Sequence, residues 1–245
     1  CDSINQIASG RIQSMNINLN ASKISRTLLI TMAILVIAHI IQLIIYYVVG
    51  DEDVFDFVDI IDMGYEGNLP TLFSSLMFMF NGLLFYLIYA NSKQTDGIDT
   101  KYWLGLCLVF LFLGVDEGTK IHENIGDFTE IFVEAEGFLY YPWVLSYVSL
   151  FLFAVFYYFR FYLRLDEKLQ IRLALSAVVF LTGAVGLEII SAEEAYVNDT
   201  DTIKYSVLYT VEETLELAGL LLLVDGLLSY IERNLNQISI KITQK

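Results

Sequence analysis

Histidine, cysteine and proline are almost absent from this chain of 245 residues, which contains two of each. Cys1 and Cys107 are too few to form a disulfide framework. His39 and His122 exclude a zinc site with three histidine ligands, and neither has the Glu-x-x-His spacing of di-iron helix bundles. With only two prolines, the sequence is typical of long, uninterrupted helices rather than of a loop-rich secreted fold.

Apolar residues are abundant instead: they make up 56% of the chain, and the mean hydropathy is +0.58, well above a soluble protein. A helix needs about 20 residues to cross about 30 Å of hydrocarbon. Runs of this length cover residues 27–49, 71–90, 102–122, 142–163, 171–191 and 206–231. We therefore predict an all-α fold, a polytopic membrane helix bundle of about six transmembrane helices. Residues 27–232 would form this domain, between a cytoplasmic N-terminal segment (1–26) and a cytoplasmic C-terminal tail (233–245).

The charged residues predict an orientation, because lysine and arginine favour the cytoplasmic side of transmembrane helices. With the N-terminus inside, 12 of the 14 basic residues fall on that side, and only Lys120 and Lys204 lie outside. The acidic residues separate in the opposite way, with 22 of 29 in the outer half. We expect an N-in/C-in multipass protein of the inner (cytoplasmic) membrane. Its partners are then the lipid bilayer and, if it belongs to a complex, other membrane subunits, with no nucleic acid.

Two outer connections mix acidic with apolar residues. Residues 51–66 and 127–141 each have the composition of a short helix that lies in the membrane interface on the outer side. They are either a solvated acidic cover or an electrostatic funnel that concentrates cations.

Carboxylates also occur within the third and fifth spans. Both spans run outward, and at 1.5 Å per residue Asp116 and Glu117 lie about 22 to 24 Å along the third. Glu188 lies about 24 Å along the fifth, which is the same level. His122 and Glu123 follow one to two turns after Glu117, near the outer surface.

The sixth span runs inward and adds Glu212 and Glu213 about 10 to 12 Å deep and Glu216 about 16 Å deep. Three helices therefore bring carboxylates to one level in the outer half of the bundle. The candidate site residues, as metal ligands, are Asp116, Glu117, His122, Glu123, Glu188, Glu212, Glu213 and Glu216.

So many close carboxylates cannot all remain charged, since like charges 4 Å apart repel by about 4 kcal/mol even at an effective dielectric of 20. They retain protons, bind a divalent metal ion (Fe, Mn, Ca or Zn), or bond to hydroxyls and backbone. Our first hypothesis is a divalent-cation site that extends to metal-dependent chemistry on a lipid or hydrophobic substrate. The alternatives are proton or cation transport through the cluster, and a non-catalytic subunit whose acidic outer face docks a basic partner. The sequence does not decide whether the protein is an enzyme.

The helix that carries Asp116 cannot aim every acid inward. Either an acid pairs with Lys120 at the protein surface, or the helix unwinds near Gly118. Gly183, Gly186 and Gly219 on the last two spans indicate close helix packing.

A few other polar residues have structural interpretations. We expect His39 to make a satisfied interhelical hydrogen bond, and Ser74 and Ser75 to be packing residues. Glu66 and Asn68 precede the second span, where they either cap that helix or reach over the cluster.

The segments YEGNLPTLFSS, FLGVDEGTKIHE and TVEETLELAG together resemble an uncharacterised bacterial multipass membrane family. Its elements are similar to Asp-Glu-x-x-x-x-His-Glu and Glu-Glu-x-x-Glu-x-x-Gly. The likeness covers roughly residues 62–230, with Gly114 and Val115 where the family pattern has Ser and Leu. The resemblance implies a membrane bundle and adds no reaction.

Overall fold

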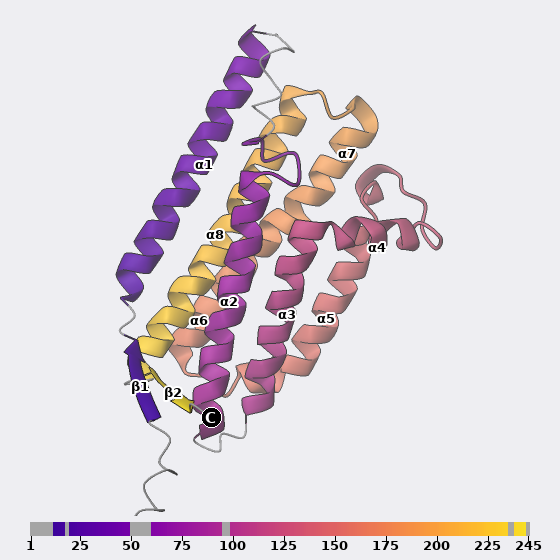
Figure 1. Cartoon of the computed structure of the whole chain (residues 1–245). Helices are drawn as coiled ribbons and strands as arrows, with labels where there is room; N and C mark the ends of the chain where they lie inside the picture. Colours follow the sequence, from indigo (N-terminus) through magenta and orange to yellow (C-terminus); the bar gives the residue numbers. More distant parts are fainter. Residues whose placement is uncertain (1–11, 18–19, 50–59, 95–98, 235–237, 244–245) are drawn as a thin grey trace, which may run out of the picture.

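The computed structural model describes residues 12–17, 20–49, 60–94, 99–234 and 238–243, and its helices run side by side in a bundle (Figure 1). Within these residues, six helices are long and apolar enough to cross a membrane. They are α1 (Ala21–Val49), α2 (Leu69–Gln94), α3 (Thr100–Thr119), α5 (Trp143–Tyr162), the continuous α6–η3–α7 (Glu167–Leu181, Thr182–Leu187 and Glu188–Asn198), and α8 (Ile203–Asn234). The predicted all-α class and the six apolar helices are confirmed, whereas the orientation in a membrane stays a prediction.

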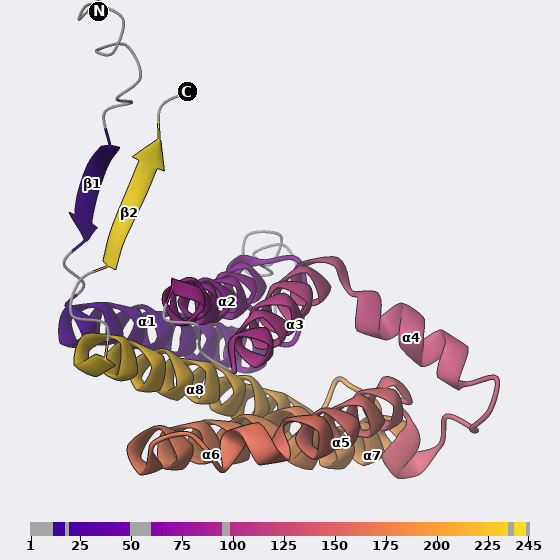
Figure 2. The same cartoon turned by 90° about the horizontal axis from the view of Figure 1, so that it is seen from below.

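Helix α8 is the centre of the bundle. It packs against α1, α2, α6, η3 and α7, and it lies between the α1–α2 side and the α6–α7 side in Figure 2. The core contains fully buried Phe85 of α2 and Leu227 and Leu228 of α8. A Cβ at Gly219 would lie 2.6 Å from the Cβ of Phe180, so glycine is needed for the close approach of α8 to α6. The packing prediction is thus confirmed for Gly219.

The outer surface of the bundle is apolar. Ile34 of α1 and Phe153 and Phe156 of α5 are 61%, 68% and 85% exposed, although side chains of this kind are normally buried in water-soluble proteins. Exposed apolar helix faces around a packed core are compatible with a multipass membrane protein.

Two predicted features differ in the structure. Residues 60–66 form turns rather than an interfacial helix. Side chains accept hydrogen bonds from backbone amides that a helix would use internally: the Gly64 amide donates to the Asp62 carboxylate at 2.8 Å. Residues 51–59 of that prediction lie outside the described residues. On the other outer connection, α4 (Ile121–Thr129) ends early, and the 3₁₀ turn η2 (Gly137–Leu139) follows. The position of these two connections in a membrane interface stays a prediction.

Two short strands lie near the two ends of the described part of the chain. Strands β1 (Ile12–Ile17) and β2 (Ile238–Thr243) pair in antiparallel fashion, with Ile12 opposite Thr243. Helix α1 begins at Ala21, inside the segment expected to precede the membrane domain, and its first amide donates to Glu232 of α8 at 2.7 Å. We call the end of the bundle with β1 and β2 the strand end, and the opposite end the α4 end (Figure 1).

Candidate functional site

A break in the third apolar helix positions the first part of the site. Helix α3 stops at Thr119 rather than at residue 122, because Lys120 adopts a left-handed conformation with φ of 58°. The chain turns there, and α4 leaves the bundle at an angle (Figure 1). The turn brings the His122 amide to the Asp116 carboxylate, to which it donates at 2.7 Å. Both sequence alternatives therefore apply: the helix is broken near Gly118, at Lys120, and Lys120 also pairs with the exposed acid Glu123 at 3.4 Å.

The side chain of His122 lies between two carboxylates. Its Nδ1 is 3.5 Å from Asp116 Oδ1, and its Nε2 is 3.2 Å from Glu66 Oε1. Lys120 Nζ lies 3.5 Å from the other oxygen of Glu66, and the Tyr147 hydroxyl donates to Asp116 at 2.6 Å. We call these five residues the ion network. It joins the loop before α2 to α3, α4 and α5.

Electrostatics fix the charge of this network. Burial alone would lower the pKa of His122, but its hydrogen bonds to Asp116 and Glu66 outweigh burial and raise this pKa to about 10. Burial likewise opposes the charged form of Glu66, yet His122 and Lys120 hold its pKa below the usual value. Near neutral pH the network therefore contains an imidazolium, an ammonium and two carboxylates.

A second set of acids lies beside the network. We call Glu117, Glu188, Glu212, Glu213 and Glu216 the glutamate cluster. Glu213 interacts electrostatically with Glu117 and Glu188. Glu216 interacts in the same way with Glu117, Glu188 and Glu213. The cluster thus combines the end of α3, the start of α7 and the first half of α8.

Hydrogen bonds hold parts of the cluster in place. Glu188 and Glu212 are bonded to each other through their carboxyl groups, and Ser191 donates to Glu212 Oε2 at 3.1 Å. The indole of Trp143 donates to Glu188, and the hydroxyl of Ser74 to Glu117. A hydrogen bond between two carboxyl groups requires that one of them carries a proton.

A π-helical turn sets how α7 faces α8. The turn is η3, directly before Glu188, and π-turns inside helices are often found at functional sites. A Cβ at Gly183 would lie 2.6 Å from the backbone oxygen of Glu212, so this glycine permits the contact. Gly186 has no such contact, since its Cβ would meet only Leu181 O at 3.8 Å. The close-packing prediction therefore holds for Gly183 and fails for Gly186.

Most of the predicted site residues are brought together, and one is not. Asp116 and His122 belong to the ion network, and the five predicted glutamates form the cluster. Glu123 instead lies exposed on α4, where its carboxylate is 3.4 Å from Lys120 Nζ. No pattern in the sequence points to the contacts of Trp143 and Tyr147, which depend on the packing of α5 against α4.

Two polar residues of the loop before α2 have different roles. Asn68 caps α2 by accepting from the Thr71 amide at 3.1 Å, whereas Glu66 reaches His122. Both sequence alternatives thus apply, each to one residue. Ser75 is a packing residue, as predicted, and donates to Gly114 O at 2.5 Å, but Ser74 contacts the cluster through Glu117.

No group of three or more His, Cys, Asp or Glu side chains within the described residues is arranged to hold a metal ion. The two ring nitrogens of His122 both face carboxylates, which leaves no lone pair for a ligand role. The predicted divalent-cation site stays a prediction.

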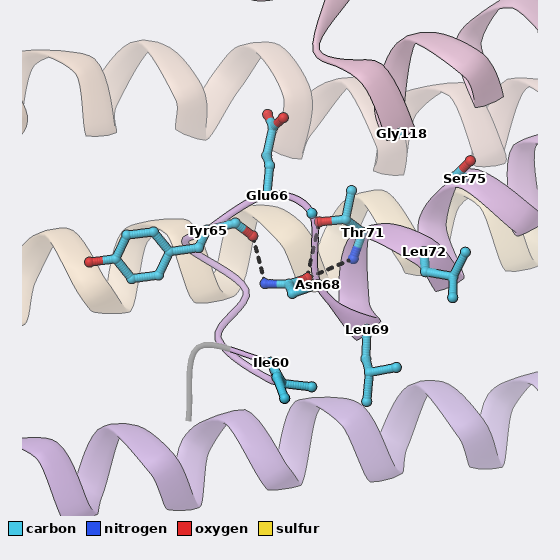
Figure 3. A pocket seen from close by; sticks show the side chains of 10 residues that line it. Ile60, Tyr65, Glu66, Asn68, Leu69, Thr71, Leu72, Ser75 and Gly118 are labelled. Carbon is cyan, nitrogen blue, oxygen red and sulfur yellow. Dashed lines mark hydrogen bonds between the residues drawn. The ribbon is translucent and has the colours of Figure 1, made fainter. Parts of the chain in front are cut away.

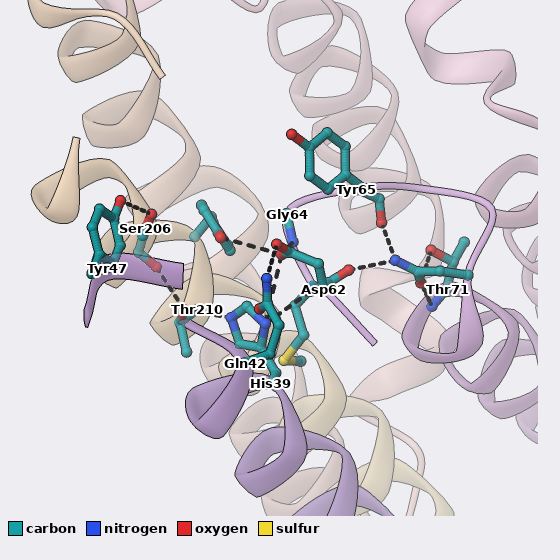
Figure 4. A network of polar contacts seen from close by, with 12 residues as sticks. His39, Gln42, Tyr47, Asp62, Gly64, Tyr65, Thr71, Ser206 and Thr210 are labelled. Carbon is teal, nitrogen blue, oxygen red and sulfur yellow. Dashed lines mark hydrogen bonds and ion pairs between the residues drawn. The ribbon is translucent and has the colours of Figure 1, made fainter. Parts of the chain in front are cut away.

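A separate buried network lies around His39 (Figure 4). His39 Nδ1 accepts from the Met63 amide at 3.2 Å, so Nε2 carries the proton and donates to Thr210 at 2.9 Å. Asp62 accepts from Gln42 at 3.0 Å and from Tyr209 at 3.2 Å. The expected interhelical hydrogen bond of His39 is confirmed, and the network fastens loop 60–68 to α1 and α8.

Comparison with known proteins gives a family and no function. A family model described as a domain of unknown function (DUF8692) matches residues 27–230, which include all the site residues. No curated protein and no solved structure matches the chain. The expected membership of an uncharacterised family is confirmed, while its bacterial origin and its motifs stay predictions.

Proposed function

Because the chain belongs to this family of unknown function, its activity has to be inferred from its own site, and we propose that the glutamate cluster is a cation-exchange site. In this proposal the cluster holds protons in the arrangement described and releases them when a divalent cation binds. Ions reach it from the α4 end, which the distribution of basic residues assigns to the outer side of the inner membrane.

The observation that carries the proposal is the charge balance. The ion network is neutral, because Asp116 and Glu66 face His122 and Lys120. The glutamate cluster has five carboxyl groups, and none of them forms an ion pair with a lysine or arginine within the described residues. Close carboxylates repel by about 4 kcal/mol per pair at 4 Å and an effective dielectric of 20. The cluster is therefore stable only with bound protons or with a bound cation.

Bound protons explain the present arrangement, because the hydrogen bond between the carboxyl groups of Glu188 and Glu212 needs a proton. A cation that replaces them would draw in Glu117, Glu213 and Glu216, which already interact with one another. Carboxylate oxygens without histidine or thiolate suit Ca²⁺ or Mn²⁺ better than Zn²⁺. We therefore propose that the exchanged cation is Ca²⁺ or Mn²⁺.

Transport through the bundle has less support. Toward the strand end, Asn81 is fully buried and bonded to backbone oxygens, and Asp225 is paired with Arg172. Apolar side chains such as Phe85 and Leu227 fill the space around α8 there. In the described part of the chain we find no continuous row of polar groups from the cluster to the strand end.

Catalysis by His122 also has less support, since a general base works best when its pKa is near the working pH. With a pKa of about 10, His122 remains protonated and neutralises the nearby carboxylates.

A role as a membrane-complex subunit stays a prediction. The interfacial position of α4 is likewise proposed, on the basis of exposed Phe128 near its end and of exposed Ile131 and Phe132 directly after it.

The test measures ions and protons together. Protein in lipid nanodiscs is stripped with a chelator, and Ca²⁺ or Mn²⁺ is added in weak buffer that contains a pH dye. We expect about one bound ion per chain by elemental analysis, with release of at least one proton on binding. Glu213→Gln and Glu216→Gln should abolish both signals, because each removes a carboxylate of the cluster.

Glu123→Gln is the matched control, because Glu123 is exposed and outside the cluster. It should bind the ion and release protons as the unmodified protein does. The proposal is wrong if neither ion binds, or if binding survives both cluster substitutions. A bound ion without proton release would contradict the exchange step.

A further inference from the structure

A pocket at the α4 end opens beside the ion network, between loop 60–68, α2 and the end of α3 (Figure 3). Its volume is about 640 Å³, which is within the range of small-molecule sites. Two kinds of side chain line it. Ile60, Leu69 and Leu72 are apolar and between 41% and 55% exposed, and a polar group consists of Glu66, Asn68, Thr71 and Ser75.

The two kinds lie on different sides of the pocket. In Figure 3, Ile60 and Leu69 point away from Glu66 and toward α1. Leu69 and Leu72 belong to the first turn of α2, one of the six apolar helices, so their exposed faces would meet lipid rather than water. The pocket therefore has an apolar side that opens toward the membrane and a polar side that faces the ion network.

On the polar side, the side chains of Thr71, Ser75 and Glu66 offer hydrogen-bond acceptors. Thr71 donates its hydroxyl proton to Asn68 Oδ1 at 3.0 Å, and Ser75 donates to Gly114 O at 2.5 Å. Asn68 uses its amide protons on the backbone oxygens of Asp62 and Tyr65. What remains for a ligand are lone pairs of the two hydroxyls, next to the carboxylate of Glu66, because the amide oxygen of Asn68 already accepts from the amide and the hydroxyl of Thr71.

We propose that this pocket binds an amphiphile from the outer leaflet whose head group donates hydrogen bonds, with its acyl chain along Leu69 and Leu72. An ethanolamine head group, with three N–H donors, fits this description. A choline head group has the same charge and no donor. A hydroxyl head group, as in diacylglycerol, has one donor and no charge. The inference goes beyond cation exchange, because the lining of the pocket includes no member of the glutamate cluster.

The test compares lipids that differ in these donors. Native mass spectrometry of the purified full chain measures how strongly phosphatidylethanolamine, phosphatidylcholine and diacylglycerol of equal chain length are retained. We expect phosphatidylethanolamine to be retained several-fold more than phosphatidylcholine, with diacylglycerol also above phosphatidylcholine. Equal retention of phosphatidylethanolamine and phosphatidylcholine overturns the proposal. Retention of phosphatidylethanolamine alone would assign recognition to its ammonium group. This outcome still supports the proposal, because phosphatidylcholine has the same charge and lacks only the hydrogen-bond donors.

A pair of tryptophan substitutions locates the site. Leu72→Trp fills the pocket and should reduce the preference to about equal retention. Leu76→Trp, one turn further along the same exposed face of α2, lies outside the lining and should keep it. If Leu72→Trp does not fold, Thr71→Val removes one acceptor and should lower the preference. An equal effect of Leu72→Trp and Leu76→Trp would overturn the proposal.

The cation-exchange proposal and the lipid-binding proposal can be tested independently of each other. Glu213→Gln should abolish proton release and leave the lipid preference unchanged, whereas Leu72→Trp should do the reverse. Loss of both signals in either variant would show that pocket and cluster form one site, which contradicts the separation proposed here.

Discussion

Glu188 of α7 and Glu212 of α8 are joined by a hydrogen bond between their carboxyl groups. The bond links adjacent helices at the level where three helices place acids, and it requires a proton that belongs to the pair. It is the most direct structural sign that the cluster is not a set of fully ionised side chains.

The first prediction concerns that pair. Glu212→Gln keeps the length of the side chain and supplies a donor for Glu188, so the midpoint of thermal unfolding should remain within about 2 °C of the unmodified protein. Glu212→Leu leaves Glu188 and Ser191 without this partner and should cost about 1–3 kcal/mol. Thermal unfolding in detergent, followed by tryptophan fluorescence, measures both. Equal destabilisation by glutamine and leucine would contradict the shared proton.

The level of the acids follows from the sequence, because helical rise and the direction of each span place Asp116, Glu188 and Glu212 by counting residues. The side-chain partners do not follow in the same way. Glu66 meets His122 only because Lys120 takes a left-handed conformation and turns the chain. No local pattern marks a lysine for that conformation, which asparagine and glycine adopt more readily.

The charge segregation of the sequence has a related limit. It predicts which side is acidic, but it does not tell which carboxylates are compensated. The structure shows that His122 and Lys120 neutralise Asp116 and Glu66, while the adjacent glutamates have no such partner. That difference depends on side-chain contacts of α3 and α4 with loop 60–68, which lies far from these two helices in the sequence.

The second prediction is a pH dependence. The folded-state pKa of His122, about 10, exceeds the ordinary value of 6.5, so its contribution is complete below pH 6.5 and disappears as pH rises through 10. Glu66 has a lowered pKa, so its contribution is present above pH 4.5 and disappears under more acidic conditions. Their ion pair is therefore strongest between pH 4.5 and 6.5.

His122→Gln tests this window, because glutamine is uncharged over the whole range. At pH 6 the variant should unfold a few degrees below the unmodified protein, consistent with about 1–3 kcal/mol for a broken, half-buried pair. The difference should shrink steadily toward pH 10. A difference that does not change with pH would show that the packing of His122 against Trp143, rather than its charge, stabilises this region.

The third prediction compares two glycines of the π-turn. Gly183→Ala places a methyl group 2.6 Å from Glu212 O, so α8 must shift, and we expect lower stability and loss of cation exchange. Gly186→Ala has room and should stabilise the helix by about 0.5–1 kcal/mol through reduced backbone entropy. The measurements are thermal unfolding and proton release upon Ca²⁺ addition. If the two variants behave alike, the close approach at Gly183 does not position the cluster.

The last prediction concerns which side of the membrane reaches the cluster. Glu123 and Glu167 are both exposed acidic residues in the first turn of a helix, at the α4 end and the strand end respectively. In a background with Cys1→Ser, where Cys107 is buried, Glu123→Cys and Glu167→Cys each supply one accessible thiol. A membrane-impermeant maleimide added to intact cells should label Glu123→Cys at once and Glu167→Cys only after permeabilisation. The reverse pattern would place both the glutamate cluster and the pocket beside α2 on the cytoplasmic side, so that cation exchange and lipid binding would both have to be tested from there.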